Sequence, residues 1–277
     1  MISKNKPNKL NLKKDNKVKK INDNLFKNSH GEIISQSEVE FTSGAELYEI
    51  AQKLIPIYGE NWGWHTISLI KRVNLSRVFY FYELYKKIIN VPGCIMEFGV
   101  HFGANLSLLI NLRGIFEPYN SSRKVIGFDT FSGFSSVDSS FDGLLSQEND
   151  VKTIDNFKDI LDQILHLQEQ NSPLNHIKRY DLIQGDVCET VDDYLDNNKH
   201  QLISLAIFDM DIYKPTKIAI EKILPRLTKG SILVFDQLNS KEYPGETLAF
   251  QEVLGANNYK IYKDPNLSYT SYLVYGE

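Results

Sequence analysis

Two aspartates separated by one residue, Asp209 and Asp211, directly follow an apolar run at residues 202–208. A run of this kind is typical of a buried strand in a parallel sheet. A second apolar run, residues 231–235, ends in Asp236. Open α/β sheets bind ligands at the carboxyl ends of their strands, so we expect the three carboxylates to meet at one ligand-binding edge. Carboxylates this close repel one another unless a cation or a proton lies among them, although helix N-capping can account for one of the three.

A glycine-containing turn follows the first predicted strand, residues 94–99, and includes Gly99 and Gly103. Glycines at such a turn let a ligand approach the backbone closely. Their G-x-x-x-G spacing is not the G-x-G-x-x-G fingerprint of dinucleotide-binding proteins, so the glycines alone are a weak signal. We interpret His101, in the same turn, as a polar loop residue.

Two further acids end predicted strands. Asp129 closes the second strand, residues 124–129, where an acid can accept hydrogen bonds from both hydroxyls of an adenosine ribose. Asp186 follows the third strand, which begins at residue 180. It suits either a hydrogen bond to an adenine amino group or an N-cap for the next helix, and the sequence leaves both interpretations open.

The elements that must position these residues begin with two helical patterns, residues 46–57 and 75–89. Both precede the sheet, so we expect them to pack across it or to cover its ligand edge. Trp62, Trp64 and His65 lie in the loop between them. We interpret all three as packing residues, since His65 has no identifiable partner for a role as catalytic base.

The later part of the chain contains a long connection, residues 135–178, with one predicted helix at residues 154–167. A connection of this length in an α/β domain is usually functional, often as a lid. Residues 260–262 and 268–275 are predicted strands that close the sheet as an antiparallel hairpin.

The 277 residues carry a net charge of −4, yet residues 1–20 contain eight lysines and one aspartate. This segment has too few apolar residues to form a core, so we predict a disordered basic tail over residues 1–29 and disfavour a nucleic-acid or membrane role for it. No stretch resembles a membrane span or a secretory signal. With only Cys94 and Cys188 as cysteines, we expect a reduced, cytoplasmic protein.

Six short motifs occur in a fixed order: EFGV at residues 97–100, GFDTFSGF at 127–134, GDV at 185–187, DMDIYKPT at 209–216, FDQLN at 235–239 and PGET at 244–247. Together, over residues 66–275, they resemble the macrocin O-methyltransferase family of class I S-adenosylmethionine-dependent methyltransferases. The resemblance implies an α/β fold with a mostly parallel, seven-stranded, Rossmann-like sheet and a C-terminal antiparallel hairpin, flanked by helices. It also implies an N-terminal helical cap at residues 30–90 and an S-adenosylmethionine-binding catalytic domain at residues 91–277.

The same resemblance implies roles for individual residues. The family methylates sugar hydroxyls of natural products, nucleotide sugars or surface glycans, and Asp211 matches its general base. The cofactor S-adenosyl-L-methionine is expected to bind at Glu97, Gly99, Val100, Gly103, Asp129, Thr130, Asp186 and Val187. The ligands of a divalent metal, Mg²⁺ or Mn²⁺, are expected to be Asp209, Asp236 and Gln237.

Gln237 departs from the family pattern, which usually has a second acid directly after the position of Asp236. An amide oxygen can still ligate a hard cation, but without a charge it binds more weakly, or it serves the substrate instead. A metal would polarise the acceptor hydroxyl, and a carboxylate would remove its proton. We expect a homo-oligomer, a sugar acceptor and no nucleic-acid partner.

Two other functions compete with this interpretation. The D-x-D spacing of Asp209 and Asp211 also fits a metal-dependent glycosyltransferase, although Asp129 and the ordered motif set disfavour it. The neutral Gln237 also allows a cofactor-binding protein without catalytic activity. A dehydrogenase is weaker still, because the phosphate-binding glycine pattern is missing.

Overall fold

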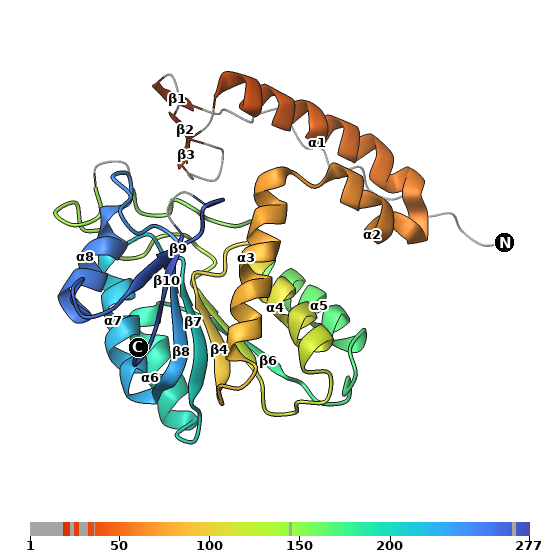
Figure 1. The fold of residues 1–277 in the computed structure, drawn as a ribbon. Helices are drawn as coiled ribbons and strands as arrows, with labels where there is room; N and C mark the ends of the chain where they lie inside the picture. The colour runs from red at the N-terminus through yellow and green to blue at the C-terminus, as the bar shows by residue number, and fades with distance from the viewer. Residues whose placement is uncertain (1–18, 23–24, 28–32, 36, 144–145, 268–269) are drawn as a thin grey trace.

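A seven-stranded sheet forms the centre of the computed structural model, which describes residues 19–22, 25–27, 33–35, 37–143, 146–267 and 270–277 (Figure 1). The strand order is β6-β5-β4-β7-β8-β10-β9. Within this sheet, only the pairings of β10 with β8 and with β9 are antiparallel, which confirms the predicted fold class and terminal hairpin. The strands are β4 (Cys94–Phe98), β5 (Val125–Asp129), β6 (Tyr180–Gln184), β7 (Ile203–Phe208), β8 (Leu227–Phe235), β9 (Ile261–Lys263) and β10 (Ser271–Val274).

Helices cover both faces of the sheet because strand side chains alternate between the faces. Ile95 and Leu205 join one core with three helices, whereas the neighbouring Met96 and Ala206 join a second core with three others. The first group is α3 (Arg72–Ile88), α4 (Ala104–Phe116) and α5 (Phe157–Gln170). The second group is α6 (Val187–Asn197), α7 (Tyr213–Ile223) and α8 (Pro244–Val253).

A row of stacked phenylalanines crosses the four central strands near their carboxyl ends. Neighbouring rings have centroid separations of 5.0, 5.4 and 4.9 Å, and the residues are paired in register across the sheet: Phe128, Phe98, Phe208 and Phe235. Each ring is the last or nearly the last residue of its strand. The register therefore aligns the four residues that follow the rings at one edge: Asp129, Gly99, Asp209 and Asp236.

A buried charge network lies at the opposite edge, where β5 and β6 begin. Glu169 of α5 is bonded to Arg113 of α4 and to Arg179 before β6, and all three side chains are at most 2% exposed. Arg113 also donates to the backbone oxygens of Arg123 and Arg179, at 3.1 and 2.6 Å. The network ties two helices to the start of the sheet.

The N-terminal part holds a small antiparallel sheet and a helical arm. The strands are β1 (Lys19–Asn22), β2 (Leu25–Lys27) and β3 (Ile33–Ser35). Within the predicted tail over residues 1–29, the structure describes only β1 and β2, whose antiparallel pairing satisfies backbone groups of the two strands. The disordered tail stays a prediction. Residues 1–18, 23–24 and 28–29 of that tail lie outside the described residues.

The arm consists of α1 (Glu38–Tyr58), the short α2 (Trp62–His65) and the start of α3, and α1 stands clear of the main sheet in Figure 1. The helix α1 begins earlier than the predicted residue 46, because Ser37 and Glu40 form a capping box. In contrast, α3 packs directly on the sheet through Tyr80, Phe81 and Leu84. None of the helices in the described ranges has the length and apolar character to span a bilayer.

Candidate active site

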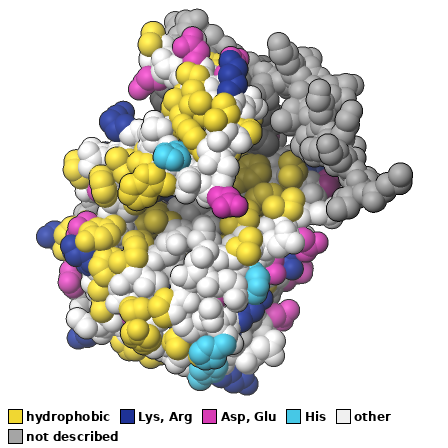
Figure 2. Space-filling model, turned by 90° about the vertical axis from the view of Figure 1, so that its right-hand side faces the viewer, with side chains coloured by type: hydrophobic (Ala, Val, Ile, Leu, Met, Phe, Trp, Pro, Cys, Tyr) yellow, Lys and Arg dark blue, Asp and Glu magenta, His cyan; other side chains and the backbone are white. Residues whose placement is uncertain are grey.

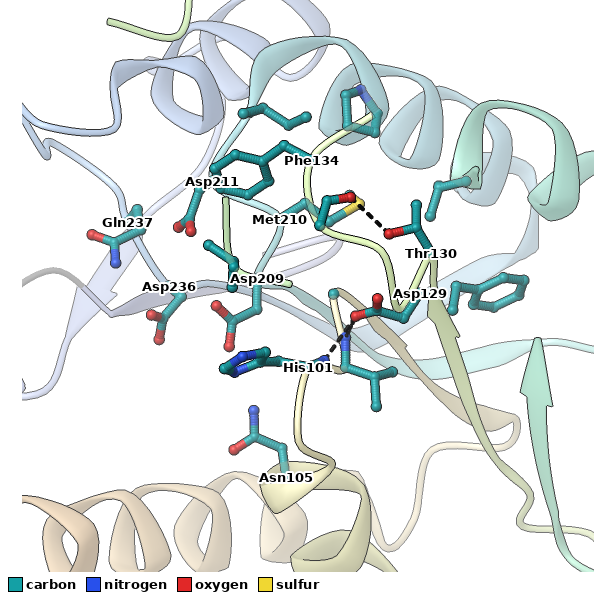
Figure 3. A pocket seen from close by; sticks show the side chains of 18 of the residues that line it. His101, Asn105, Asp129, Thr130, Phe134, Asp209, Met210, Asp211, Asp236 and Gln237 are labelled. Atoms are coloured by element: carbon teal, nitrogen blue, oxygen red, sulfur yellow. Dashed lines mark hydrogen bonds between the residues drawn. The ribbon is translucent and has the colours of Figure 1, made fainter. Parts of the chain in front are cut away.

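A cavity of about 630 Å³ opens at the carboxyl edge of β4, β5, β7 and β8, and α3 forms part of its wall (Figure 3). Most of the residues predicted for the site line it: Gly99, Val100, Asp129, Thr130, Asp186, Val187, Asp209, Asp211, Asp236 and Gln237. Two predicted cofactor residues, Glu97 and Gly103, do not. The long connection after β5 also reaches the cavity, through Phe134, Ser135 and Val151.

The two glycines of the turn after β4 are explained by packing within the chain. Gly99 has φ 88°, and a Cβ atom there would lie 1.9 Å from the backbone oxygen of Asp209. Gly103 has φ 78° at the N-cap of α4, and a Cβ atom would lie 2.2 Å from Leu161. Both positions therefore require glycine, and Gly99 allows the ends of β4 and β7 to touch beneath the cavity.

Asp129 ties the β4 turn to the end of β5. Its Oδ2 atom accepts hydrogen bonds from the backbone N–H groups of Val100 and His101, both at 2.7 Å, and its Oδ1 atom accepts from Phe131 at 2.6 Å. A carboxylate has about four acceptor positions, so three backbone donors leave capacity for a ligand. The side chain holds the turn in shape and also lines the cavity.

Asp186 caps helix α6. Its Oδ1 atom accepts from the backbone N–H of Cys188 at 2.8 Å, and its Oδ2 atom accepts from the hydroxyls of Ser135 and Ser136. Burial alone would raise the pKa of Asp186, but these hydrogen bonds lower it below its usual value. The N-cap interpretation is confirmed, while the adenine interpretation stays a prediction. Neither serine was predicted from the sequence.

The guanidinium of Arg77, from α3, joins the two predicted metal ligands. Its Nη2 atom donates to Asp209 at 2.9 Å, and its Nη1 atom donates to Asp236 at 3.2 Å. Its Nε atom donates to Asn105, which in turn donates to the buried Glu97. Burial alone would lower the pKa of Arg77, but attraction by Asp236, Asp209 and Glu97 raises it. Arg77 was not predicted from the sequence, where its only signal is a cation two residues before the aromatic stretch of α3 at residues 79–82.

A divalent cation does not fit the predicted ligands while Arg77 holds this position. One oxygen of Asp209 and one of Asp236 already bind the guanidinium, and a second cation between them would be repelled. In Figure 3 the amide of Gln237 lies on the far side of Asp236 from Asp209. Within the described ranges, no group of three or more His, Cys, Asp or Glu side chains is arranged to hold a metal ion.

Asp211 lies in the turn between β7 and α7 and faces the cavity (Figure 3). Its φ of 63° is left-handed, a conformation that aspartate and asparagine adopt more readily than most residues. The turn is held from outside by Asp142, which accepts from the backbone N–H of Tyr213 at 2.5 Å. A tertiary contact from the long connection thus supplies the N-terminal hydrogen bond that α7 lacks locally.

Two buried glutamates support the floor of the site. Burial is the main cause that raises the pKa of Glu97 well above its usual value, and the nearby negative charges of Asp209 and Asp129 add to it. Burial also raises the pKa of Glu246, and the nearby negative charges of Asp236 and Asp211 raise it further. Glu246 also accepts from the backbone N–H of Gln237 at 2.7 Å. Glu246 lies in the PGET motif, but its role could not be predicted from the sequence.

Comparison with known proteins identifies the family. A family model described as macrocin-O-methyltransferase (TylF) matches residues 50–254. The chain belongs to this family. This methyltransferase is 35% identical to the protein of the structure titled "Crystal Structure of CalS11, Calicheamicin Methyltransferase". The two structures superpose with a TM-score of 0.85, and the match covers 88% of this chain and 95% of that chain. No curated protein matches the chain significantly in sequence.

Two further solved structures resemble the chain, one in sequence and fold and the other in fold alone. The apo structure of CalS11, described as a TDP-rhamnose 3'-O-methyltransferase of calicheamicin biosynthesis, is 33% identical, with a TM-score of 0.78, and covers 88% of this chain and 97% of that chain. The O-methyltransferase NovP shares the fold at 15% identity, with a TM-score of 0.51, over 72% of this chain and 79% of that chain.

Family membership makes the protein an S-adenosylmethionine-dependent O-methyltransferase. It also decides between the functions that the sequence left open, in favour of the methyltransferase over the D-x-D glycosyltransferase and the non-catalytic binding protein.

Proposed function

We propose that the enzyme methylates a sugar hydroxyl and that Asp211 removes the proton from that hydroxyl. The observation that carries the proposal is the placement of Asp211 in the same cavity as Asp129 and the turn at Gly99. The proposed base and the residues predicted to bind the cofactor thus line the same cavity. The sugar is supported by the description of CalS11 as a TDP-rhamnose methyltransferase.

The cofactor is proposed to lie along the β4, β5 and β6 side of the cavity. Asp129 would accept the ribose hydroxyls, and Asp186 and Val187 would border the adenine. Thr130 and the backbone at Gly99 and Val100 would line the path between them. A cavity rich in carboxylates fits this group, because S-adenosylmethionine carries a positive sulfonium and a positive amino group.

Two of the predicted cofactor residues would act from below the cavity. Glu97 holds Asn105, which lines the wall, and Gly103 allows α4 to begin directly after the turn. Their proposed contribution is to shape the cofactor turn.

The chemical step needs a deprotonated hydroxyl in line with the methyl group. S-adenosylmethionine held by Asp129 and the turn at Gly99 would supply an electrophilic methyl carbon for the acceptor oxygen, and its sulfur would leave with the electron pair of the carbon–sulfur bond. Asp211 accepts the hydroxyl proton at its carboxylate, a contribution of about 10²- to 10⁴-fold in rate. The cavity walls hold the acceptor in line, which lowers the entropic part of the barrier.

The predicted Mg²⁺ or Mn²⁺ at Asp209, Asp236 and Gln237 stays a prediction. Such an ion would polarise the acceptor hydroxyl. Because Arg77 already bridges Asp209 and Asp236, the residues do not fit an ion in this arrangement, and no step above depends on one.

Replacing Asp129 by alanine tests the cofactor site. Charge-assisted hydrogen bonds to the ribose are worth about 1.5–3 kcal/mol, so calorimetric affinity for S-adenosylhomocysteine should fall by about ten- to a hundredfold. Asp181→Ala is the matched control, because Asp181 lies on β6, bonds Lys124 and does not line the cavity. Unchanged affinity in folded Asp129→Ala protein would remove Asp129 from the cofactor site.

We also propose that the enzyme forms a homo-oligomer through its N-terminal arm. Large apolar side chains of the arm are strongly exposed in the single chain, among them Val39 at 75%, Ile57 at 75% and Trp64 at 77%. Hydrophobic side chains gather in the upper part of the face shown in Figure 2. Many large apolar side chains exposed in one region mark an interaction site, and a second copy of the chain is the commonest partner.

Light scattering after size exclusion should therefore show more than one chain per particle. Trp64→Glu should shift the protein toward the monomer, because a charge in an apolar interface is desolvated without a partner. Tyr119→Glu, at an exposed aromatic outside the arm, should leave the mass unchanged. A wild-type monomer at high concentration would refute the oligomer.

A further inference from the structure

We propose that the guanidinium of Arg77 takes the place of a divalent cation between Asp209 and Asp236, so that this enzyme transfers methyl groups without a metal ion. The inference rests on the proposed function, since it concerns the same carboxylates. It assigns Arg77 as a positioning residue that supplies the positive charge for this part of the site.

Hydrogen bonds and packing fix the guanidinium of Arg77 in one position. Its three donor nitrogens bond three different elements: Asn105 of α4, Asp209 after β7 and Asp236 after β8. Its guanidinium also lies 5.7 Å from the ring centroid of Phe81, one turn along α3. On the other side, the Thr270 hydroxyl donates to Asp236 at 3.0 Å. The guanidinium is therefore fixed from several directions.

Arg77 offsets part of the negative charge here without a further cation. Asp209 and Asp236 bring two negative charges and Arg77 brings one positive charge, so one net negative charge remains, and the neighbouring Gln237 is neutral. Hard cations depend on charged oxygen ligands, so an amide at this place weakens any metal that competes with the guanidinium. A dication bonded to the same carboxylates would also lie next to the guanidinium and be repelled by it. Arg77 and a metal ion thus compete for one position.

A planar guanidinium suits this position chemically as well. It stays charged at any physiological pH, and its N–H donors form a rigid fork that matches carboxylates. Because Arg77 lines the cavity, its charge also favours negative charge that develops on an acceptor oxygen.

Counting bound Mn²⁺ by electron paramagnetic resonance tests the inference without any turnover. Chelator-treated wild type should bind no Mn²⁺ at this site. Arg77→Gln should bind about one ion per chain, at least about tenfold more tightly than wild type, because it exposes two unneutralised carboxylates. Adding Asp236→Asn to Arg77→Gln should abolish that binding. Arg72→Gln, which removes the same charge from an exposed position on α3, should behave as wild type.

Activity provides a second test. If Arg77 had only a structural role, added metal ions would not restore the activity of Arg77→Gln. Wild-type turnover should be unchanged by exhaustive chelation. Arg77→Gln should lose about ten- to a hundredfold in kcat, and Mn²⁺ or Mg²⁺ should restore part of that loss. Arg77→Lys keeps the charge and should exclude Mn²⁺, so it tests the idea even where Arg77→Gln does not fold.

One Mn²⁺ per chain in wild type that disappears in Asp209→Asn would overturn the inference, as would loss of wild-type activity on chelation. The proposed function stands or falls separately, since S-adenosylhomocysteine binding and methylation of a sugar acceptor are measured with Arg77 intact.

Discussion

Replacing Asp211 by asparagine is expected to lower kcat by about 10²- to 10⁴-fold, which is the usual contribution of a positioned general base. The amide has the same shape but cannot take the proton from the acceptor hydroxyl. Asp211 has φ 63°, and asparagine tolerates this left-handed conformation as well as aspartate does. The turn between β7 and α7 should therefore keep its shape, and the loss should be chemical.

The measurement is a steady-state assay combined with calorimetry. Affinity for S-adenosylhomocysteine and the melting temperature should match the wild type, because Asp211 is proposed to contact neither the cofactor nor the core. Asp193→Asn, at an exposed position of α6, provides a control for an amide substitution outside the cavity. A kcat within about threefold of wild type in Asp211→Asn would show that another group accepts the proton.

Replacing Glu169 by alanine is expected to destabilise the fold by about 3–5 kcal/mol, because it leaves Arg113 and Arg179 buried without their carboxylate. Both arginines are at most 1% exposed. Arg179 donates to Glu169 from Nε at 3.0 Å and from Nη2 at 2.6 Å. Removing one partner from such a network costs far more than removing an exposed ion pair.

Urea unfolding would measure this change as a shift of the midpoint at a constant slope. Glu252→Ala is the matched control, because Glu252 also pairs with a cation, Lys217, but on the surface of α8. Its midpoint should barely move. The network lies at the edge of the sheet opposite the cavity, so cofactor affinity should persist in the folded fraction of Glu169→Ala. A destabilisation below about 1 kcal/mol would mean that water or another group replaces the carboxylate.

Much of the site could be predicted because it depends on strand periodicity. Side chains alternate along a strand, and parallel strands end at a common edge, so the order of strands and terminal acids already predicted that Asp209, Asp211 and Asp236 meet and that Asp129 ends a neighbouring part of the sheet. The phenylalanine row preserves that alignment in the folded protein. The capping role of Asp186 was open to prediction for a similar reason, since a helix cap involves residues only a few positions apart.

The contacts that decide the chemistry could not be predicted in this way. Arg77 is 132 residues from Asp209 and 159 from Asp236, and Asp142 is 71 residues from the Tyr213 backbone that it holds. No local pattern encodes such pairs, because they depend on where α3 and the long connection pack against the finished sheet. The same is true of the glycines: the sequence suggested a close ligand, whereas Gly99 is required by the backbone of Asp209.

The sequence by itself determined the family, the sheet and the edge at which the acids gather, since these follow from periodicity and from the order of short motifs. The tertiary structure alone decided what neutralises the acids. Three or more carboxylates at one edge demand positive charge, and residue types cannot say whether an ion or a side chain supplies it. Here the packing of α3 across the sheet brings the guanidinium of Arg77 between Asp209 and Asp236.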